Sequence, residues 1–140
     1  MRLITFISTG IFIVLSGFIM KKGNQAQTPS SLYETKWLLK KIHTDSGIEV
    51  VNTKAFIKFD EAKQSAGGNG SCNSFGSTTS IEKNKISFKN IFSTKMYCAD
   101  VQQTENRYFT LLGKVNRFEV KDNQLTLYLD KEVLLEFAAE

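Results

Sequence analysis

The chain has few of the residues that catalytic and cofactor sites usually require. Its 140 residues include one histidine, one tryptophan, one proline and two cysteines. One histidine with two cysteines is one ligand short of a structural zinc site, and no Cys-x-x-Cys pair is present to form a redox motif. No Gly-Lys-Ser or Gly-Lys-Thr follows the glycine-rich segment, which excludes a phosphate-binding loop. The sequence therefore predicts no metal and no cofactor.

Catalytic combinations of side chains are also missing. His43, the only histidine, stands beside Thr44-Asp45-Ser46-Gly47, where we expect a surface loop. A Ser-His-Asp or Cys-His arrangement needs partners that the sequence does not place near this histidine. The carboxylates are dispersed, and no pair is singled out as acid and base. These observations predict a protein that is not an enzyme.

The excess of positive charge is small and lies mostly at the N-terminus. Three of the eighteen basic residues precede Gln27, so the remainder carries fifteen basic against fourteen acidic residues, a net charge of +1. Nucleic-acid binding requires clustered lysine and arginine. We therefore expect no nucleic-acid partner.

An apolar run occupies residues 3–20, between Arg2 and the pair Lys21-Lys22. A basic start, an apolar run and a polar exit are typical of a signal peptide or an uncleaved signal anchor, which we place over residues 1–26. A buried core helix is the alternative, although the run has no polar face. We expect export to the bacterial periplasm or cell envelope, with membrane contact only through this segment if it is not cleaved.

Two further features describe the N-terminal region. Leu15-Ser16-Gly17-Phe18 resembles a lipoprotein box in which phenylalanine replaces the cysteine that would carry the lipid, so a lipoprotein is excluded. Residues 27–34 contain the only proline, Pro29, and are polar enough to be a linker. The remaining residues 35–140 are sufficient for one domain.

Hydrophobic alternation dominates the domain, and one segment has helical spacing instead. The predicted strands are 36–42, 55–59, 77–81, 85–88, 91–96, 117–121, 124–129 and 133–137. For residues 36–42 the mixed pattern is also compatible with a helix. The predicted helix is 100–114, with Asp100 as its N-cap and Gly113 near its end; Glu105 and Arg107 are expected to point away from the core. This pattern predicts a mainly β (α+β) fold: a small antiparallel sheet, curled into a partly open barrel of about eight short strands, with one helix packed against it.

Aromatic residues are numerous for a domain of this size. We expect Trp37 to anchor one end of the core, because a buried tryptophan contributes a large apolar area. Most of the phenylalanines at 56, 59, 75, 88, 92, 109 and 118 are expected in the core. Some of them could line an apolar cavity, which makes a lipid or another small apolar ligand one candidate partner.

The glycine-rich segment 67–76 and the segment 93–98 hold the only two cysteines, Cys72 and Cys98. In an exported chain this pair predicts a disulfide that stabilises the fold by about 3 kcal/mol on the loop-entropy model. Two buried free thiols or a thiol-redox pair are the alternatives. The glycines predict bulges, positive φ values or close backbone approaches in a bent sheet, and Asn73 is expected to form a local hydrogen bond there.

The same segments resemble the META/HslJ-like family. The similarity rests on Thr35-x-Trp37, on the block containing Gly68, Gly70, Cys72, Asn73, Phe75 and Gly76, on Thr94-x-Met96-x-Cys98, and on Glu105 ahead of Leu111-Leu112. Two residues depart from the pattern: Tyr97 stands where the family often has alanine before the second cysteine, and Ser71 stands where it commonly has glycine or another small residue. The resemblance implies a small β-rich module of the bacterial envelope, linked to stress and antibiotic tolerance, with no established enzymatic activity and with an unknown envelope protein or apolar ligand as its partner.

Overall fold

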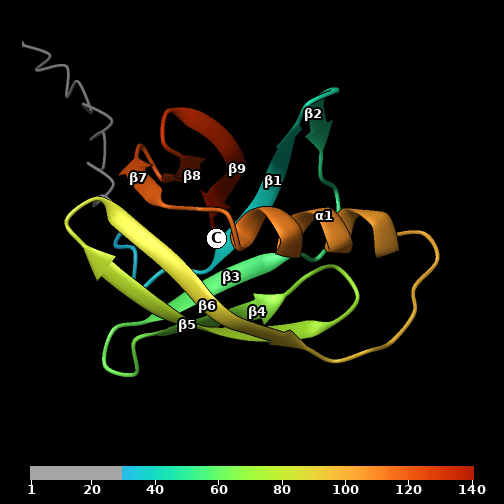
Figure 1. The fold of residues 1–140 in the computed structure, drawn as a ribbon, viewed down its shortest axis with the longest axis horizontal. Coiled ribbons are helices and arrows are strands. Elements are labelled where there is room, and N and C mark those ends of the chain that lie inside the picture. Colours follow the sequence, from blue (N-terminus) through green and yellow to red (C-terminus); the bar gives the residue numbers. More distant parts are fainter. Residues whose placement is uncertain (1–29) are drawn as a thin grey trace, which may run out of the picture.

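The computed structural model describes residues 30–140, which form nine antiparallel strands and one helix (Figure 1). The strands are β1 (Trp37–Thr44), β2 (Gly47–Val50), β3 (Phe56–Asp60), β4 (Ser65–Asn69), β5 (Ser74–Glu82), β6 (Lys85–Ser93), β7 (Arg117–Lys121), β8 (Gln124–Leu129) and β9 (Glu132–Ala139). The helix, α1 (Gln102–Leu112), lies between β6 and β7 in the chain. This one helix of residues 30–140 is too short and too polar to cross a membrane.

The sheet closes nearly into a ring. Its order is β2-β1-β3-β4-β5-β6-β7-β8-β9, and β9 also pairs with β1. The weakest junction is β6–β7, where Lys85 and Arg117 are the one pair in register within the described chain. The helix is inserted between these two strands in the sequence and packs Tyr108 and Leu112 into the core, so α1 covers the part of the ring that the strands leave open (Figure 1).

Side chains fill the interior of the ring. Trp37, Tyr108 and Phe137 are the largest of the fully buried residues, with exposed fractions of 0, 0 and 1%. The Tyr108 ring packs against Phe75 at 5.6 Å and against Phe137 at 6.0 Å between ring centroids. The expected role of Trp37 as a core anchor is therefore confirmed, and its indole N–H donates to the carbonyl of Leu32.

The predicted fold class is confirmed, although several strands differ from the prediction. The strands β2 and β4 were not predicted, and β5 and β6 are longer than expected because they pair along most of their length. Residues 94–96 are not a strand, since β6 ends at Ser93. Phe92 is one of the phenylalanines outside the core that was expected to hold most of them, since it is 70% exposed. It lies opposite Gly76, just after a register shift in the β5–β6 pair.

The ends and the buried side of the helix also differ from the prediction. Asp100 is not the N-cap: Val101 occupies that position without a side-chain capping bond, and the helix begins at Gln102. Glu105 was expected to point away from the core but is only 2% exposed. Part of the segment predicted as a linker packs on the domain, because Leu32 is buried and Ser30 bonds to Asn123.

Candidate functional site

Most of the motif residues gather where the β4–β5 turn meets the start of α1. A disulfide joins Cys72 in that turn to Cys98 in the segment before the helix, with their Cα atoms 5.9 Å apart. This pairing confirms the predicted disulfide, and it means that the alternatives of free thiols and an open redox pair do not describe this state of the protein. The bridge connects two segments that are 26 residues apart in the sequence.

Glu105 is at the centre of this region. Its Oε2 accepts hydrogen bonds from the backbone N–H of Cys72 at 2.9 Å and of Asn73 at 2.6 Å. Its Oε1 accepts a third bond, at 2.6 Å, from the side-chain amide of Asn73. A buried carboxylate is tolerated when such donors replace water. The helix is therefore attached to the β4–β5 turn through one side chain.

Asn73 extends the connection to the segment before the helix. Its Oδ1 accepts bonds from the Thr94 hydroxyl and from the Met96 backbone N–H, both at 2.8 Å, and its Nδ2 donates to the Met96 carbonyl at 3.0 Å. These partners are 21 and 23 residues away, so the local hydrogen bond expected for Asn73 is replaced by long-range ones. Met96 takes part through its backbone, and its side chain is exposed.

The glycines of the motif allow close approach. A Cβ added at Gly70 would collide with the Phe109 ring and lie 2.7 Å from Glu105 Oε2, and one at Gly76 would lie 2.6 Å from the Phe92 ring. The sequence predicted that these glycines permit a bulge, a positive φ or a close approach of neighbouring atoms. At Gly70 and Gly76 the structure shows the close approach. A positive φ occurs instead at Ser71, whose φ of 126° is unfavourable for a residue with a side chain.

The remaining motif residues support this region from the strands. Phe75 on β5 is buried against Tyr108 and Phe109 of the helix. Gly68 on β4 lies so close to β3 that an added Cβ would collide with the Phe56 carbonyl. Trp37 makes none of the hydrogen bonds around Glu105 and belongs to the core. Ser71, which the sequence marked only as a departure from the family pattern, is hydrogen-bonded to the Thr53 hydroxyl at 2.7 Å.

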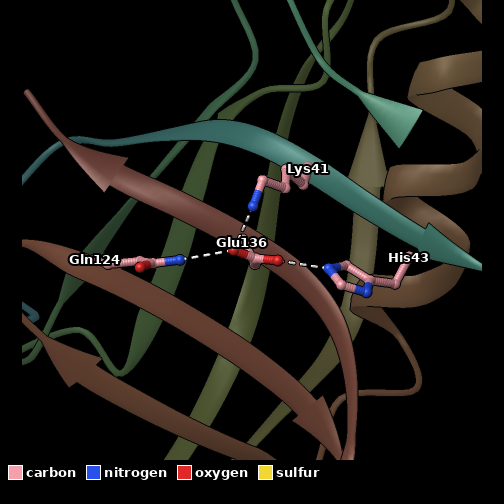
Figure 2. Close-up of polar contacts among 4 residues, drawn as sticks. All are labelled: Lys41, His43, Gln124 and Glu136. Carbon is pink, nitrogen blue, oxygen red and sulfur yellow. Dashed lines mark hydrogen bonds and ion pairs between the residues drawn. The ribbon is translucent and has the colours of Figure 1, made fainter. Parts of the chain in front are cut away.

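A second polar cluster lies on the outer surface of β1, β8 and β9 (Figure 2). His43 Nε2 and Glu136 Oε1 are hydrogen-bonded at 2.6 Å, and Glu136 Oε2 accepts from Lys41 at 3.3 Å and from Gln124 at 2.7 Å. Burial alone would raise the pKa of Glu136, but the hydrogen bonds from His43 and Lys41 outweigh it and lower the pKa below 4.5. His43 was expected in a surface loop; it lies instead within β1 and is held by this carboxylate.

His43 also borders a cleft of about 340 Å³. The cleft lies between α1, the β1–β2 turn and the start of β9, and its lining contains both apolar and charged side chains. The lining residues are His43, Thr44, Asp45, Asn106, Arg107, Thr110, Leu111, Lys114, Leu129, Glu132 and Leu134. Sequence reasoning did not find this site, because its residues come from four separate segments of the chain.

Comparison with known proteins identifies the domain. The META domain family matches residues 30–140. The chain belongs to the META domain family. This confirms the resemblance that the cysteine and glycine motifs indicated. No curated protein matches the chain.

Two solved structures share the fold of this META domain. The NMR structure of a protein from Burkholderia xenovorans has a TM-score of 0.66 and 22% identity, and the match covers 85% of this chain and 96% of that chain. A second NMR structure has a TM-score of 0.59 and 23% identity, covering 79% of this chain and 94% of that chain. At this level of identity the likeness concerns the fold alone.

The chemistry available to the META domain differs between its two polar regions. Around Glu105 the carboxylate, the amide of Asn73 and the adjoining backbone groups bond to one another. At the cleft, charged side chains face solvent over an apolar floor, which is the arrangement of a binding site. No group of three or more potential metal ligands occurs within residues 30–140.

Proposed function

We propose that this META domain is an exported, non-catalytic binding module of the bacterial cell envelope. The observation that carries the proposal is the use made of the motif: Glu105, Asn73 and the disulfide fasten the β4–β5 turn to α1. Polar groups that are occupied in this way maintain the fold and are not free to act on a substrate. In this proposal the motif forms a stable scaffold, and the outer surface makes the contacts with the partner.

Export is part of the proposal because the disulfide is consistent with it. Structural disulfides persist in oxidising compartments such as the periplasm and are rare in the bacterial cytosol. The apolar run at residues 3–20 supports the same location. A role in stress or antibiotic tolerance is implied by the family resemblance, and a scaffold that resists unfolding suits such conditions.

The interior of the ring does not favour the alternative that the domain carries a lipid or another small apolar ligand in an internal cavity. Trp37, Tyr108 and Phe137 occupy the positions that an enclosed lipid chain would need, and each is at most 1% exposed. Among the phenylalanines of residues 30–140, Phe92 is the most exposed, and it lies on the outside of β6. We therefore place the ligand or partner on the outer surface of the domain.

Native mass spectrometry of the full chain, purified from its own cell envelope, tests the proposal. We expect a mass two hydrogens below that of the reduced chain, together with a non-covalent complex. A reduced protein recovered from the cytosol would overturn the assignment to the envelope. Turnover of a defined substrate by the purified protein, lost on changing one polar residue, would overturn the non-catalytic assignment.

A further inference from the structure

The cleft between α1 and the two turns has opposite charges on its two sides. Arg107 lines it from the helix and Lys114 from the turn just after the helix, while Asp45 lines it from the β1–β2 turn and Glu132 from the start of β9. Within residues 30–140, Lys114, Asp45 and Glu132 form no ion pair. Each of these three charges is therefore available to a ligand.

Carboxylates behind the cleft hold two of its polar groups in place. Arg107 Nη1 is 2.6 Å from Glu49 Oε2, and Glu49 in turn accepts a hydrogen bond from the Thr104 hydroxyl at 2.7 Å. Glu136 fixes His43 through Nε2 and leaves Nδ1 without a bond in the described structure (Figure 2). Arg107 has further N–H groups beyond the one that Glu49 engages. Groups fixed in advance lose less entropy when a ligand binds.

The floor of the cleft is apolar. Leu134 is buried at 4% exposure, and Leu111 and Leu129 are half-buried beside it. With about 340 Å³, the cleft has the volume of a small-molecule site. An apolar floor between positive and negative walls matches a ligand with a carboxylate at one end, an ammonium group at the other and an aliphatic body between them.

We propose that this cleft binds a short zwitterionic peptide with aliphatic side chains. The peptide carboxylate faces Arg107 and Lys114, its ammonium group faces Asp45 and Glu132, and its side chains rest on the three leucines. The inference rests on the proposed binding function and adds a ligand class to it. A second cleft of about 300 Å³ beside Met96 and Tyr97 is less suited, because the Asn73 and Glu105 groups on its wall already bond to each other.

Calorimetric titration of the full chain with the dipeptide leucyl-leucine tests the inference. Two comparison ligands separate its parts: glycyl-glycine keeps the charges without the aliphatic side chains, and N-acetyl-leucyl-leucine amide keeps the side chains without the charges. We expect leucyl-leucine to bind in the millimolar range or tighter, and each comparison ligand to bind at least about fivefold more weakly.

Variants on the two walls provide the matched test. Lys114→Gln and Glu132→Gln remove exposed charges that form no ion pair in residues 30–140, so both proteins should fold normally. Each substitution should lower the affinity for leucyl-leucine about threefold, which is the effect expected for the loss of one partly solvated charge pair. Lys89→Gln on the outside of β6 is the control and should change nothing.

The outcomes distinguish this inference from the function on which it rests. Failure of leucyl-leucine to bind at about 10 mM, or binding that neither wall variant weakens, overturns the peptide site. If a partner from the envelope still binds the wall variants, only the peptide site is lost. If neither experiment finds a complex, the binding function is lost as well. Release of free leucine during the titration would support the site and overturn the non-catalytic assignment.

Discussion

Replacing Glu105 by glutamine should lower the free energy of unfolding by about 3 kcal/mol. The carboxylate accepts three hydrogen bonds, two from backbone N–H groups and one from the side-chain amide of Asn73. Glutamine keeps a single acceptor oxygen. If that oxygen serves the two backbone groups, the new NH2 group faces the Asn73 amide, and two donors meet with no acceptor between them.

Asn73 cannot relieve this conflict by rotating its amide. Its Oδ1 already accepts from the Thr94 hydroxyl and the Met96 N–H, and its Nδ2 also donates to the Met96 carbonyl. Rotation would exchange two of these bonds for repulsive contacts. The substitution therefore loses a charge-assisted hydrogen bond, worth about 1.5–3 kcal/mol, and leaves a buried donor unpaired at a cost of about 1–3 kcal/mol. About 3 kcal/mol is a central value for these overlapping effects.

Guanidinium denaturation with the disulfide intact measures this loss. The fluorescence of Trp37 reports unfolding, because it is the only tryptophan and is fully buried. Glu82→Gln is the control: Glu82 is exposed at the end of β5, and the change should cost less than about 0.5 kcal/mol. If Glu105→Gln cost no more than this control, the hydrogen bonds around Glu105 would not stabilise the fold and the reasoning would be refuted.

Three further predictions follow from individual side chains. Ser71→Gly and Ser71→Ala both remove the hydroxyl, but only glycine adopts a φ of 126° without strain. In denaturation experiments the free energy of unfolding of Ser71→Gly should exceed that of Ser71→Ala by about 1 kcal/mol, and equal values would show that the position is unstrained. Tyr108→Phe removes a buried hydroxyl without a hydrogen-bond partner in residues 30–140 and should raise the free energy of unfolding by about 1 kcal/mol; a lower value would contradict this. Because the pKa of Glu136 is lowered below 4.5 in the folded state, its contribution is complete above that pH and disappears as the pH falls through the folded pKa. Glu136→Gln should therefore reduce the denaturation midpoint at neutral pH and do so progressively less as the pH falls through the folded pKa of Glu136, whereas a difference that stays constant down to acid unfolding would contradict the lowered pKa.

The sequence predicted the strands that have one buried and one exposed side. In β8, Leu125 and Leu127 are fully buried on one side, which is the alternation that the sequence shows. The strand β4 has the sequence Ser-Ala-Gly-Gly-Asn, which has low β propensity, and it forms because β3 and β5 pair with it on both edges. Pairing between distant segments cannot be read from local composition, and this is why β4 was missed.

The burial of Glu105 had a signal in the sequence that hydrophobicity alone does not use. Charged residues are rarely buried unless they are paired, so Glu105 was left out of the buried side of the predicted helix. Yet Glu105 is separated from Tyr108 by three positions and from Leu112 by seven, which places it on the same side of the helix as these core residues. Its membership of the family motif was the second indication. The cleft offered no comparable signal, because Asp45 and Glu132 come together with the helix only through the ring closure between β1 and β9.

The helix α1 contributes to both polar regions, the hydrogen bonds around Glu105 and the cleft. A change at one region can therefore affect the other. Glu105 attaches it to the β4–β5 turn, while Arg107 and Lys114, within three turns of the same segment, line the cleft. A domain of ordinary stability that loses about 3 kcal/mol still keeps most of its molecules folded. If the bonds of Glu105 only stabilise the fold, Glu105→Gln should leave the affinity for leucyl-leucine nearly unchanged under native conditions. A clear loss of affinity in a protein that remains folded would mean that these bonds also set the position of the helix wall of the cleft.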